Sequence, residues 1–350
     1  MLNVFFLKRV ISFRLDGIFS LLCMCFLSSC LSVGQHGAET DEFDTWIQEQ
    51  NKIRVLSTVE MINDVVQRVG RDHVVALTLI KGSLDPHTYE LVKGDGEKLD
   101  YADIIFWNGL ELEHGPSLKH RLSMSGKAFA LGDIIQKQEP NVVLNVDGRV
   151  DPHIWMDISI WMKTVPVIAE VLGEIDPENK EEYLKNAKEY VLEMKETHDE
   201  VLTLMKSVPS QRRYLVTSHD AFNYFARSYL ADADEVSQKQ WESRVIAPEG
   251  LAPEAQISTM DIQKTIDYLK AYKIDVIFPE SNVSRDSIKK IVNAGREKGM
   301  DLIVADTALY GDAMGEAGSS GDTYLKMIKH NVVVISSYLN GDYREAQVQP

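Results

Sequence analysis

Two short stretches of the chain place a histidine in the same local arrangement. Residues 85–91 read DPHTYEL and residues 151–157 read DPHIWMD, so His87 and His153 each follow an Asp-Pro pair. Proline disfavours the α region for the residue before it, and each DPH is therefore expected in a turn. A third histidine, His219 in YLVTSHDAF, follows a strand-like run and is also expected in a turn.

Three histidines in loops of this kind indicate a metal site. Neutral imidazole suits zinc, iron and copper and, with help from a carboxylate, manganese. In parallel α/β folds, ligands bind beyond the carboxyl ends of strands, in such loops. The alternative is that all three are structural histidines, which the pattern alone leaves open. His114 in ELEHG is a weaker candidate for the metal site. The other histidines are interpreted as structural or, for His36, as part of a tether, namely His36, His73, His120, His198 and His330.

The segments that must position these histidines alternate between strand-like and helix-like patterns. β-branched and apolar runs predict strands over 53–59, 74–80, 103–109, 127–133, 212–218, 275–281 and 301–307. Amphipathic segments with helical spacing lie between them. Such alternation is typical of mostly parallel α/β sheets, and the sequence predicts two α/β lobes.

A single long helix is predicted to bridge the two lobes. The segment 176–209 has Pro177 near its start and Pro209 past its end, which suits one uninterrupted helix. At 1.5 Å per residue it would be about 45 Å long. A coiled-coil arm is the alternative, but α/β segments flank the helix on both sides. The spacing places an apolar stripe on one side of this helix, made of Leu184, Ala187, Val191, Met194, His198, Val201 and Met205.

The N-terminus has the pattern of a secretory signal. Lys8, Arg9 and Arg14 precede an apolar run that ends in LSSC and is too short to span a bilayer comfortably. LSSC resembles the bacterial lipoprotein box, in which Cys30 becomes the lipidated first residue. An ordinary cleaved signal or a buried helix is the alternative. Cys30 would be the only cysteine of the mature chain, which excludes an internal disulfide.

These patterns divide the chain into five parts. They are a signal peptide (1–29), a tether (30–51), an N-terminal lobe (52–176), the connecting helix (177–208) and a C-terminal lobe (209–350). The 44% of hydrophobic and 26% of charged residues are those of a soluble globular protein. A net charge of −16 argues against a nucleic-acid partner, because phosphate binding needs a basic surface.

Over residues 52–340 the chain resembles the cluster A-I (TroA-like) solute-binding proteins of bacterial metal ABC importers. The resemblance is carried, in order, by DPHTYEL, DPHIWMD, VTSHDAFNYF, APEGLAPEAQIS, LYGDAMG and TYLKMIKHN. It implies two lobes bridged by one rigid helix, with the metal held between them by His87, His153, His219 and Asp312. Manganese-selective members have a glutamate where this chain has His219. The long histidine-rich loop of many zinc-specific members is missing.

That ligand set favours binding over catalysis. Three imidazoles and one carboxylate saturate a tetrahedral zinc, or a higher-coordinate manganese if Asp312 binds through both oxygens. No position is then left for the activated water of a catalytic zinc, so no enzyme is expected. Asp306 in VADT is the weaker competitor of Asp312. Glu280 is expected to orient a ligand, with a capping or loop role as the alternative. Tyr89 and Trp155 could shield the site or simply pack in the lobe.

The expected function is that of an extracytoplasmic substrate-binding protein. It would capture one divalent ion of zinc, manganese or iron between its lobes and deliver it to the membrane permease of an ABC importer. It is expected in the periplasm or at the cell surface, as a monomer anchored through lipid on Cys30. One rival is a secreted metallohydrolase with Glu280 as general base, although no H-E-x-x-H motif occurs. The other is a metal-stabilised adhesin.

Overall fold

The computed structural model of the chain describes residues 42–252 and 257–342. It separates residues 1–48 from residues 49–350, which form a second unit. Residues 42–48 are helical, and the predicted signal peptide, Cys30 and most of the predicted tether lie outside the described residues. Within the described part of the chain, no helix has the length and apolar character needed to cross a membrane. The fold described below is that of residues 49–350.

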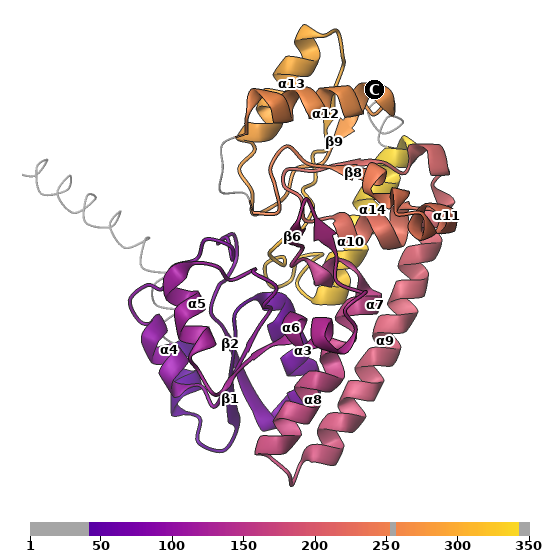
Figure 1. Cartoon of the computed structure of the whole chain (residues 1–350). Helices are drawn as coiled ribbons and strands as arrows, with labels where there is room; N and C mark the ends of the chain where they lie inside the picture. The colour runs from indigo at the N-terminus through magenta and orange to yellow at the C-terminus, as the bar shows by residue number, and fades with distance from the viewer. Residues whose placement is uncertain (1–41, 253–256, 343–350) are drawn as a thin grey trace, which may run out of the picture. The chain divides into compact units, whose positions relative to one another are not determined.

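The first lobe is built on a four-stranded parallel sheet with the order β2-β1-β3-β4. Helices connect successive strands, so the carboxyl ends of all strands lie at one edge of the sheet (Figure 1). The loops after β1, β2 and β3 lie at that edge, as ligand-carrying loops do in parallel α/β folds. The strands are β1 (Ile53–Ser57), β2 (Val74–Thr78), β3 (Ile104–Trp107) and β4 (Ala128–Ala130). The helices are α3 (Glu60–Gly70), η1 (Arg71–His73), α4 (Asp95–Tyr101), α5 (Pro116–Ser123) and α6 (Leu131–Gln138).

An antiparallel hairpin and three short helical segments complete this lobe. The hairpin turns at Asp147 and Gly148, whose φ angles of 50° and 79° are those of a two-residue Asp-Gly turn. The second DPH motif follows the hairpin directly. The elements are β5 (Asn145–Val146), β6 (Arg149–Val150), η2 (Ile154–Met156), α7 (Ile158–Trp161) and α8 (Thr164–Ile175).

The predicted long helix is α9 (Lys180–Ser207), an uninterrupted helix of 28 residues. It packs on α3 and α8 of the first lobe and on the second-lobe segments η4 (Ala226–Leu230) and α14 (Tyr324–Asn340). It therefore runs along both lobes (Figure 1). In the predicted apolar stripe, Leu184, Val191 and His198 are half-buried, and the other members are buried. The buried side chains are Tyr183, Asn186, Ala187, Tyr190, Met194, Thr197, Val201 and Met205.

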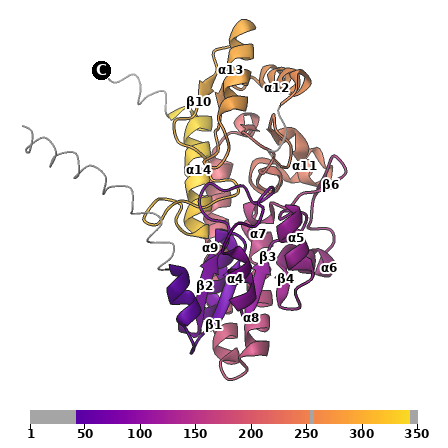
Figure 2. The same cartoon turned by 90° about the vertical axis from the view of Figure 1, so that its left-hand side faces the viewer.

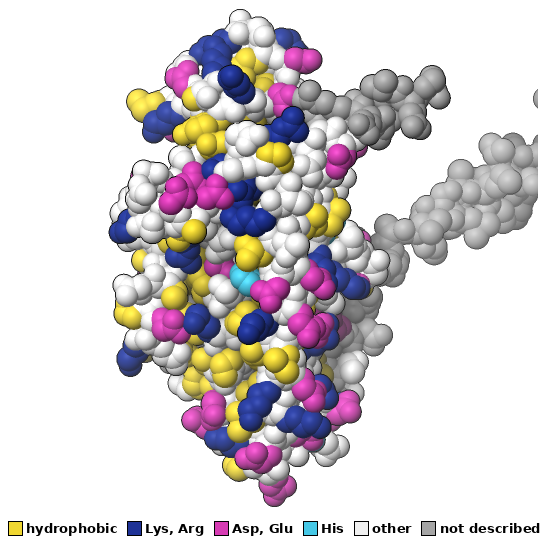
Figure 3. All heavy atoms as spheres, turned by 90° about the vertical axis from the view of Figure 1, so that its right-hand side faces the viewer, with side chains coloured by type: hydrophobic (Ala, Val, Ile, Leu, Met, Phe, Trp, Pro, Cys, Tyr) yellow, Lys and Arg dark blue, Asp and Glu magenta, His cyan; other side chains and the backbone are white. Residues whose placement is uncertain are grey.

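On the side of the molecule on which α9 lies, charged side chains of both signs are spread over the surface (Figure 3). Hydrophobic side chains are scattered among them. On α9 itself, Leu192 is 62% exposed. A coiled-coil arm would show a continuous apolar seam along the helix. The outer face of α9 is therefore a solvated surface, and its apolar face is used inside the chain.

The second lobe contains two pairs of parallel strands, β7–β8 and β9–β10. Phe278 N donates to Val216 O at 2.8 Å, which places the segment after β9 beside β7. The strands are β7 (Leu215–Val216), β8 (Val245–Ile246), β9 (Val276–Ile277) and β10 (Ile303–Val304). The helical segments are η3 (Ser210–Arg212), α10 (Asn223–Phe225), η4, α11 (Ala233–Ser237), η5 (Gln240–Arg244), α12 (Thr259–Ala271), α13 (Asp286–Glu297) and α14.

These second-lobe strands are shorter than the sequence predicts. Residues next to the His219 loop interrupt their pairing. Pro279 has no N–H, so β9 cannot extend its ladder through that residue. Beyond β7, the N–H groups of Ser218 and His219 donate to the side chain of Glu280 and not to a neighbouring strand. Regular pairing therefore ends where the candidate site begins.

The last helix, α14, contacts both lobes. At its first residue, Tyr324 Oη donates to the carbonyl of Trp155 in the first lobe at 2.8 Å. Near its other end, Tyr338 Oη accepts from Asp306 N at 3.0 Å in the second lobe. Both views show α14 near α9, against which it packs (Figures 1 and 2). The two lobes are therefore joined by contacts of α14 as well as by α9.

Candidate metal centre

The structure brings His87, His153, His219 and Asp312 together. One ligand atom from each residue lies within 4.8 Å of all the others. The nitrogen Nε2 of His87, of His153 and of His219 lies 3.5, 3.4 and 3.1 Å, respectively, from the nearest oxygen of Asp312. All four residues are at most 3% exposed. Ligand atoms of a tetrahedral site with bonds of about 2.1 Å lie about 3.4 Å apart, so this spacing fits one small metal ion.

The two DPH motifs position their histidines by the same local device. Asp85 Oδ1 accepts from the N–H of His87 at 2.9 Å, and Asp151 Oδ1 accepts from the N–H of His153 at 2.9 Å. An aspartate that accepts from the backbone two residues further on forms an Asx-turn. The motif recurs because this turn, with proline at its centre, directs each histidine side chain into the space between the lobes.

The two motifs differ in what else the aspartate holds. Asp151 is buried, and its Oδ1 also lies 2.7 Å from His153 Nδ1. Asp85 uses its second oxygen to accept from the Thr88 hydroxyl at 2.8 Å. Asp151 therefore orients the imidazole ring itself, a contact that sequence reasoning missed. The signal was present in the motif, since the aspartate stands two residues before its histidine.

Glu280 occupies the corresponding place behind His219. Its Oε2 lies 2.7 Å from His219 Nδ1, while its Oε1 accepts from the backbone of Ser218 and His219 at 3.0 and 2.9 Å. Glu280 is 2% exposed. A carboxylate at Nδ1 fixes the tautomer that offers Nε2 to a metal. Glu280 therefore contacts both the ring and the backbone of His219.

Burial and charge act in opposite directions on the titration of this cluster. Burial lowers the pKa of His87 below its usual value, despite the nearby Asp312. Burial opposes protonation of His219 as well, but the charges of Asp312 and Glu280 outweigh it and raise its pKa well above the ordinary value. Burial would raise the pKa of Asp312, yet the charge of His219 holds it well below the usual range.

The segment that carries Asp312 passes very close to the other candidate ligands. A Cβ added at Gly311 would lie 2.3 Å from Glu280 Oε2 and 3.2 Å from His219 Cε1, so the site has no space for a side chain there. Trp155 Nε1 donates to the Gly311 carbonyl at 3.0 Å, and its ring centroid lies 5.2 Å from that of His153. Trp155 therefore covers His153 and also holds the Asp312 segment.

Other residues considered from the sequence lie outside this group of four. Asp306 is exposed and bonds Tyr338. Tyr89 donates to Asp95 Oδ2 at 2.8 Å. The His114 ring lies 5.7 Å from that of His87, and His114 Nδ1 lies 3.0 Å from the Glu111 carbonyl. Four further histidines lie elsewhere on the lobes, namely His73, His120, His198 and His330, whereas His36 is outside the described residues.

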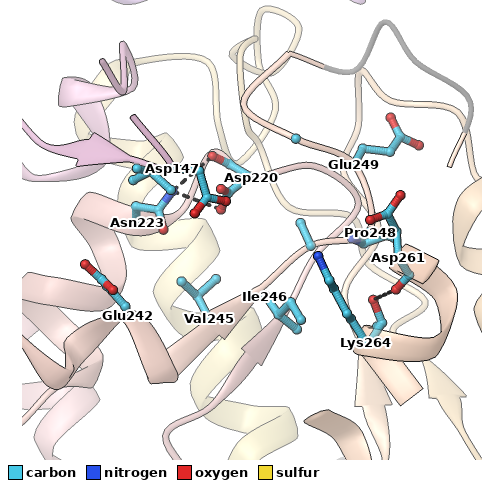
Figure 4. A pocket seen from close by; sticks show the side chains of 14 residues that line it. Asp147, Asp220, Asn223, Glu242, Val245, Ile246, Pro248, Glu249, Asp261 and Lys264 are labelled. Atoms are coloured by element: carbon cyan, nitrogen blue, oxygen red, sulfur yellow. Dashed lines mark hydrogen bonds between the residues drawn. The ribbon is translucent and has the colours of Figure 1, made fainter. Parts of the chain in front are cut away.

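An acidic pocket of about 390 Å³ adjoins the His219 loop (Figure 4). Burial and, to a smaller extent, the charge of Asp151 together raise the pKa of Asp220 to about 7. Burial also raises the pKa of Glu249 to about 7, with the charge of His219 opposing and that of Glu280 adding to the effect. No local sequence pattern indicates this pocket, because its walls come from separate segments of the chain. Its charged lining residues are Asp147, Asp220, Glu242, Glu249, Asp261 and Lys264.

Comparison with known proteins gives consistent matches over most of the chain. It is 42% identical over 293 residues to the metal-binding protein YtgA of Chlamydia pneumoniae, which covers 84% of this chain and 88% of that protein. It is 30% identical over 305 residues to the manganese-binding lipoprotein MntA of Bacillus subtilis, covering 87% and 94% of the two chains.

The fold matches that of a solved relative. The crystal structure of Fe(III)-bound YtgA from Chlamydia trachomatis superposes with a TM-score of 0.77 at 37% identity, covering 81% of this chain and 97% of the other. The family model described as zinc-uptake complex component A, periplasmic, matches residues 55–338. That range contains both DPH motifs, the long helix and all four candidate ligands. The chain therefore belongs to the ZnuA family of metal-binding proteins.

Proposed function

We propose that this chain is the extracytoplasmic substrate-binding protein of an ABC importer and that its substrate is a transition metal ion. Its ligands are His87, His153, His219 and Asp312. One observation carries the proposal: four buried ligand atoms from loops far apart in the sequence lie within 4.8 Å of one another. Members of this family are transport binding proteins, which favours capture of the ion over chemistry on it.

Zinc, manganese and iron are the candidate substrates. Relatives of this chain include the zinc-binding protein TroA of Treponema pallidum, the manganese-binding MntA and the Fe(III)-bound YtgA. Three imidazoles and one carboxylate suit all three metals, since first-row ions differ more in preferred geometry than in accepted ligands. Asp312 has two oxygens near imidazole nitrogens, and a shift from one-oxygen to two-oxygen binding would accommodate the larger coordination number of manganese.

The mechanism follows from where the ligands are held. His87 and His153 come from loops of the first lobe, and His219 follows β7 of the second lobe. An ion that binds all of these ligands has a higher affinity for the arrangement in which the loops are close together, and it therefore shifts the protein towards that arrangement. Because α9 packs along both lobes, the expected movement on release is a small tilt with local loop movement. Release to the permease then requires that these ligands separate.

The proposal includes anchoring at the membrane by lipid on Cys30. Removal of a signal over 1–29 would leave Cys30 as the first residue, followed by a tether over 30–51. The name of the relative MntA includes the word lipoprotein, which supports this part of the proposal. The lobes are proposed to span 52–176 and 209–350, with the helix 177–208 between them, and the protein to act as a monomer.

Metal binding by single substitutions tests the proposal. His87→Ala and Asp312→Ala should each weaken Zn²⁺ binding in a chelator-competition titration by 100-fold or more, as about 3 kcal/mol of lost ligand energy would give. His120→Ala, on the exposed side of α5, is the matched control and should bind as the parent does. Elemental analysis of protein purified from metal-limited native cells identifies the ion. Unchanged affinity in both site variants would refute the ligand assignment.

A further inference from the structure

The loop that carries Asp312 changes lobes within a few residues. Leu309 is still paired with the second lobe, because its N–H donates to Pro279 O and its carbonyl accepts from Ser281 N, both at 2.8 Å. Two of the next hydrogen bonds, at Gly311 and at Met314, go to the first lobe. The Gly311 carbonyl accepts from Trp155 Nε1 at 3.0 Å. The segment that carries Asp312 is therefore bonded to the second lobe at Leu309 and to the first lobe at Gly311.

A second contact with the first lobe follows two residues after Asp312. The N–H of Met314 donates to Glu60 Oε2 at 3.2 Å. Glu60 is the first residue of α3, directly beyond the carboxyl end of β1. Its other oxygen, Oε1, accepts from the N–H of Gly82 at 3.4 Å. Gly82 lies in the segment between β2 and the first DPH motif, five residues before His87.

One carboxylate therefore accepts from two backbone segments that each carry a candidate ligand. The contact joins residues 254 positions apart in the chain. A carboxylate has two oxygens and can accept one N–H through each of them at the same time. Glu60 is half-buried, which limits competition from water for these N–H groups. It makes no contact with the candidate ligands themselves in the hydrogen bonds described, so it would act on them through the backbone.

We propose that Glu60 is a positioning residue for metal capture, which ties the His87 loop to the Asp312 loop and so fixes the separation of these two ligands. The inference rests on the proposed function and adds to it. With Glu60 and Trp155 holding its segment, Asp312 stays with His87 and His153 when the lobes part. His219, backed by Glu280, is then the ligand that withdraws from the ion.

Two substitutions of Glu60 distinguish the loss of both hydrogen-bond acceptor oxygens from the loss of only one. Glu60→Ala removes both acceptors and keeps a good helix-forming residue at the start of α3. Glu60→Gln keeps one amide oxygen for one N–H. We expect Glu60→Ala to weaken Zn²⁺ binding about tenfold or more, in the range seen when partners of metal ligands are removed. The effect of Glu60→Gln should be smaller. Glu189→Ala, which removes an exposed ion pair with Arg71, is the control and should leave affinity unchanged.

A double-mutant cycle shows whether Glu60 acts through Asp312. Added to Asp312→Ala, the Glu60→Ala substitution should cost little further affinity, because the ligand that it positions is already absent. The visible spectrum of the Co²⁺-loaded protein gives a second readout, since a displaced carboxylate changes the ligand field. Apo-protein melting curves show whether each variant is folded. If Glu60→Ala does not fold, the same cycle with Glu60→Gln decides.

The outcomes distinguish this inference from the proposed function. Unchanged Zn²⁺ affinity and Co²⁺ spectrum in folded Glu60→Ala would overturn the positioning role. If Glu60→Ala weakened Zn²⁺ binding equally in the parent and in Asp312→Ala, the positioning role would also be overturned, because the effect would then not act through Asp312. If instead Asp312→Ala itself binds normally, the proposed ligand set fails, and Glu60 is not the cause.

Discussion

His219 Nδ1 lies 2.7 Å from Glu280 Oε2, and His219 Nε2 lies 3.1 Å from Asp312 Oδ2. The imidazole is thus held between two buried carboxylates, one at each ring nitrogen. A carboxylate at Nδ1 makes an imidazole a stronger metal donor and leaves its Nε2 available to an ion. The same carboxylate binds the backbone on which His219 stands, so the ring and its loop are oriented together.

Glu280→Gln should weaken metal binding while the protein stays folded. Glutamine retains the length and one oxygen for the backbone N–H groups but loses the negative charge behind His219. The expected loss of Zn²⁺ affinity is about 10–100-fold, measured by competition with a chelator. Glu297→Gln, exposed at the end of α13, removes one charge without touching the cluster and serves as the control. Equal affinities of the two variants would contradict the orienting role.

The two DPH motifs predict unequal effects of the same substitution. Asn preserves the turn at both positions, since it also accepts from the backbone two residues on. Asp151→Asn removes the charge that lies 2.7 Å from the His153 ring and should lower Zn²⁺ affinity about tenfold or more. Asp85→Asn changes only a contact with the backbone and Thr88 and should have a much smaller effect. Titration of both variants side by side checks the difference, and a larger effect at Asp85 would refute it.

Gly311→Ala should disturb the site although it adds a single methyl group. The new Cβ would lie 2.3 Å from Glu280 Oε2, so either Glu280 or the Asp312 segment must move. Weaker Zn²⁺ binding and a changed Co²⁺ spectrum are expected. Gly96→Ala, in α4 with open space around its Cα, is the control and should bind normally. A Gly311→Ala protein with parental affinity would mean that the loop adapts without cost.

One pH effect on stability is expected far from the metal centre. A hydrogen bond from Ser210, followed by the contacts with Arg213 and Lys206, lowers the pKa of Asp232 to about 2, from its usual value near 3.8. A depressed carboxyl pKa stabilises the folded state above the unfolded pKa, and this contribution is lost as the pH falls towards the folded one. The side chain is partly exposed, so solvent screening reduces the contribution.

Asp232→Asn should therefore lower the free energy of unfolding at neutral pH, and the difference from the parent should shrink as the pH falls from about 4 towards about 2. Asparagine can still cap α11, so the helix start is preserved. Urea denaturation at several pH values measures this difference. Asp234→Asn, exposed in the same helix, controls for the loss of one negative charge. A difference that stays constant over this range would contradict the assignment.

Much of the fold follows from local sequence patterns. The alternation of strand and helix patterns predicted the parallel sheets, and two prolines with helical spacing predicted α9 nearly to its ends. The DPH turns marked two histidines because proline and aspartate have strong local effects on the backbone. The choice of Asp312 over Asp306 came from the resemblance to a family and not from spacing.

The rest depends on contacts between distant segments. Glu60 reaches Met314 across 254 positions, and nothing in the sequence around either residue indicates the pair. The sequence predicted longer strands in the second lobe. In the structure, the N–H groups of Ser218 and His219 donate to the side chain of Glu280 and not to the carbonyls of a neighbouring strand. The stripe predicted on α9 did not include two buried tyrosines, Tyr183 and Tyr190, whose hydroxyls donate to Asp176 and Asp64.

The length of the uninterrupted helix α9 can also serve as a fixed reference distance within the protein. Its 28 residues rise about 42 Å, and a straight helix of this kind keeps that length whatever the lobes do. Spin labels at Glu181 and Lys206, near its two ends, would report a constant separation in the presence and absence of cargo. Against that fixed reference, a third label on α12 would record how far the second lobe swings during loading and unloading.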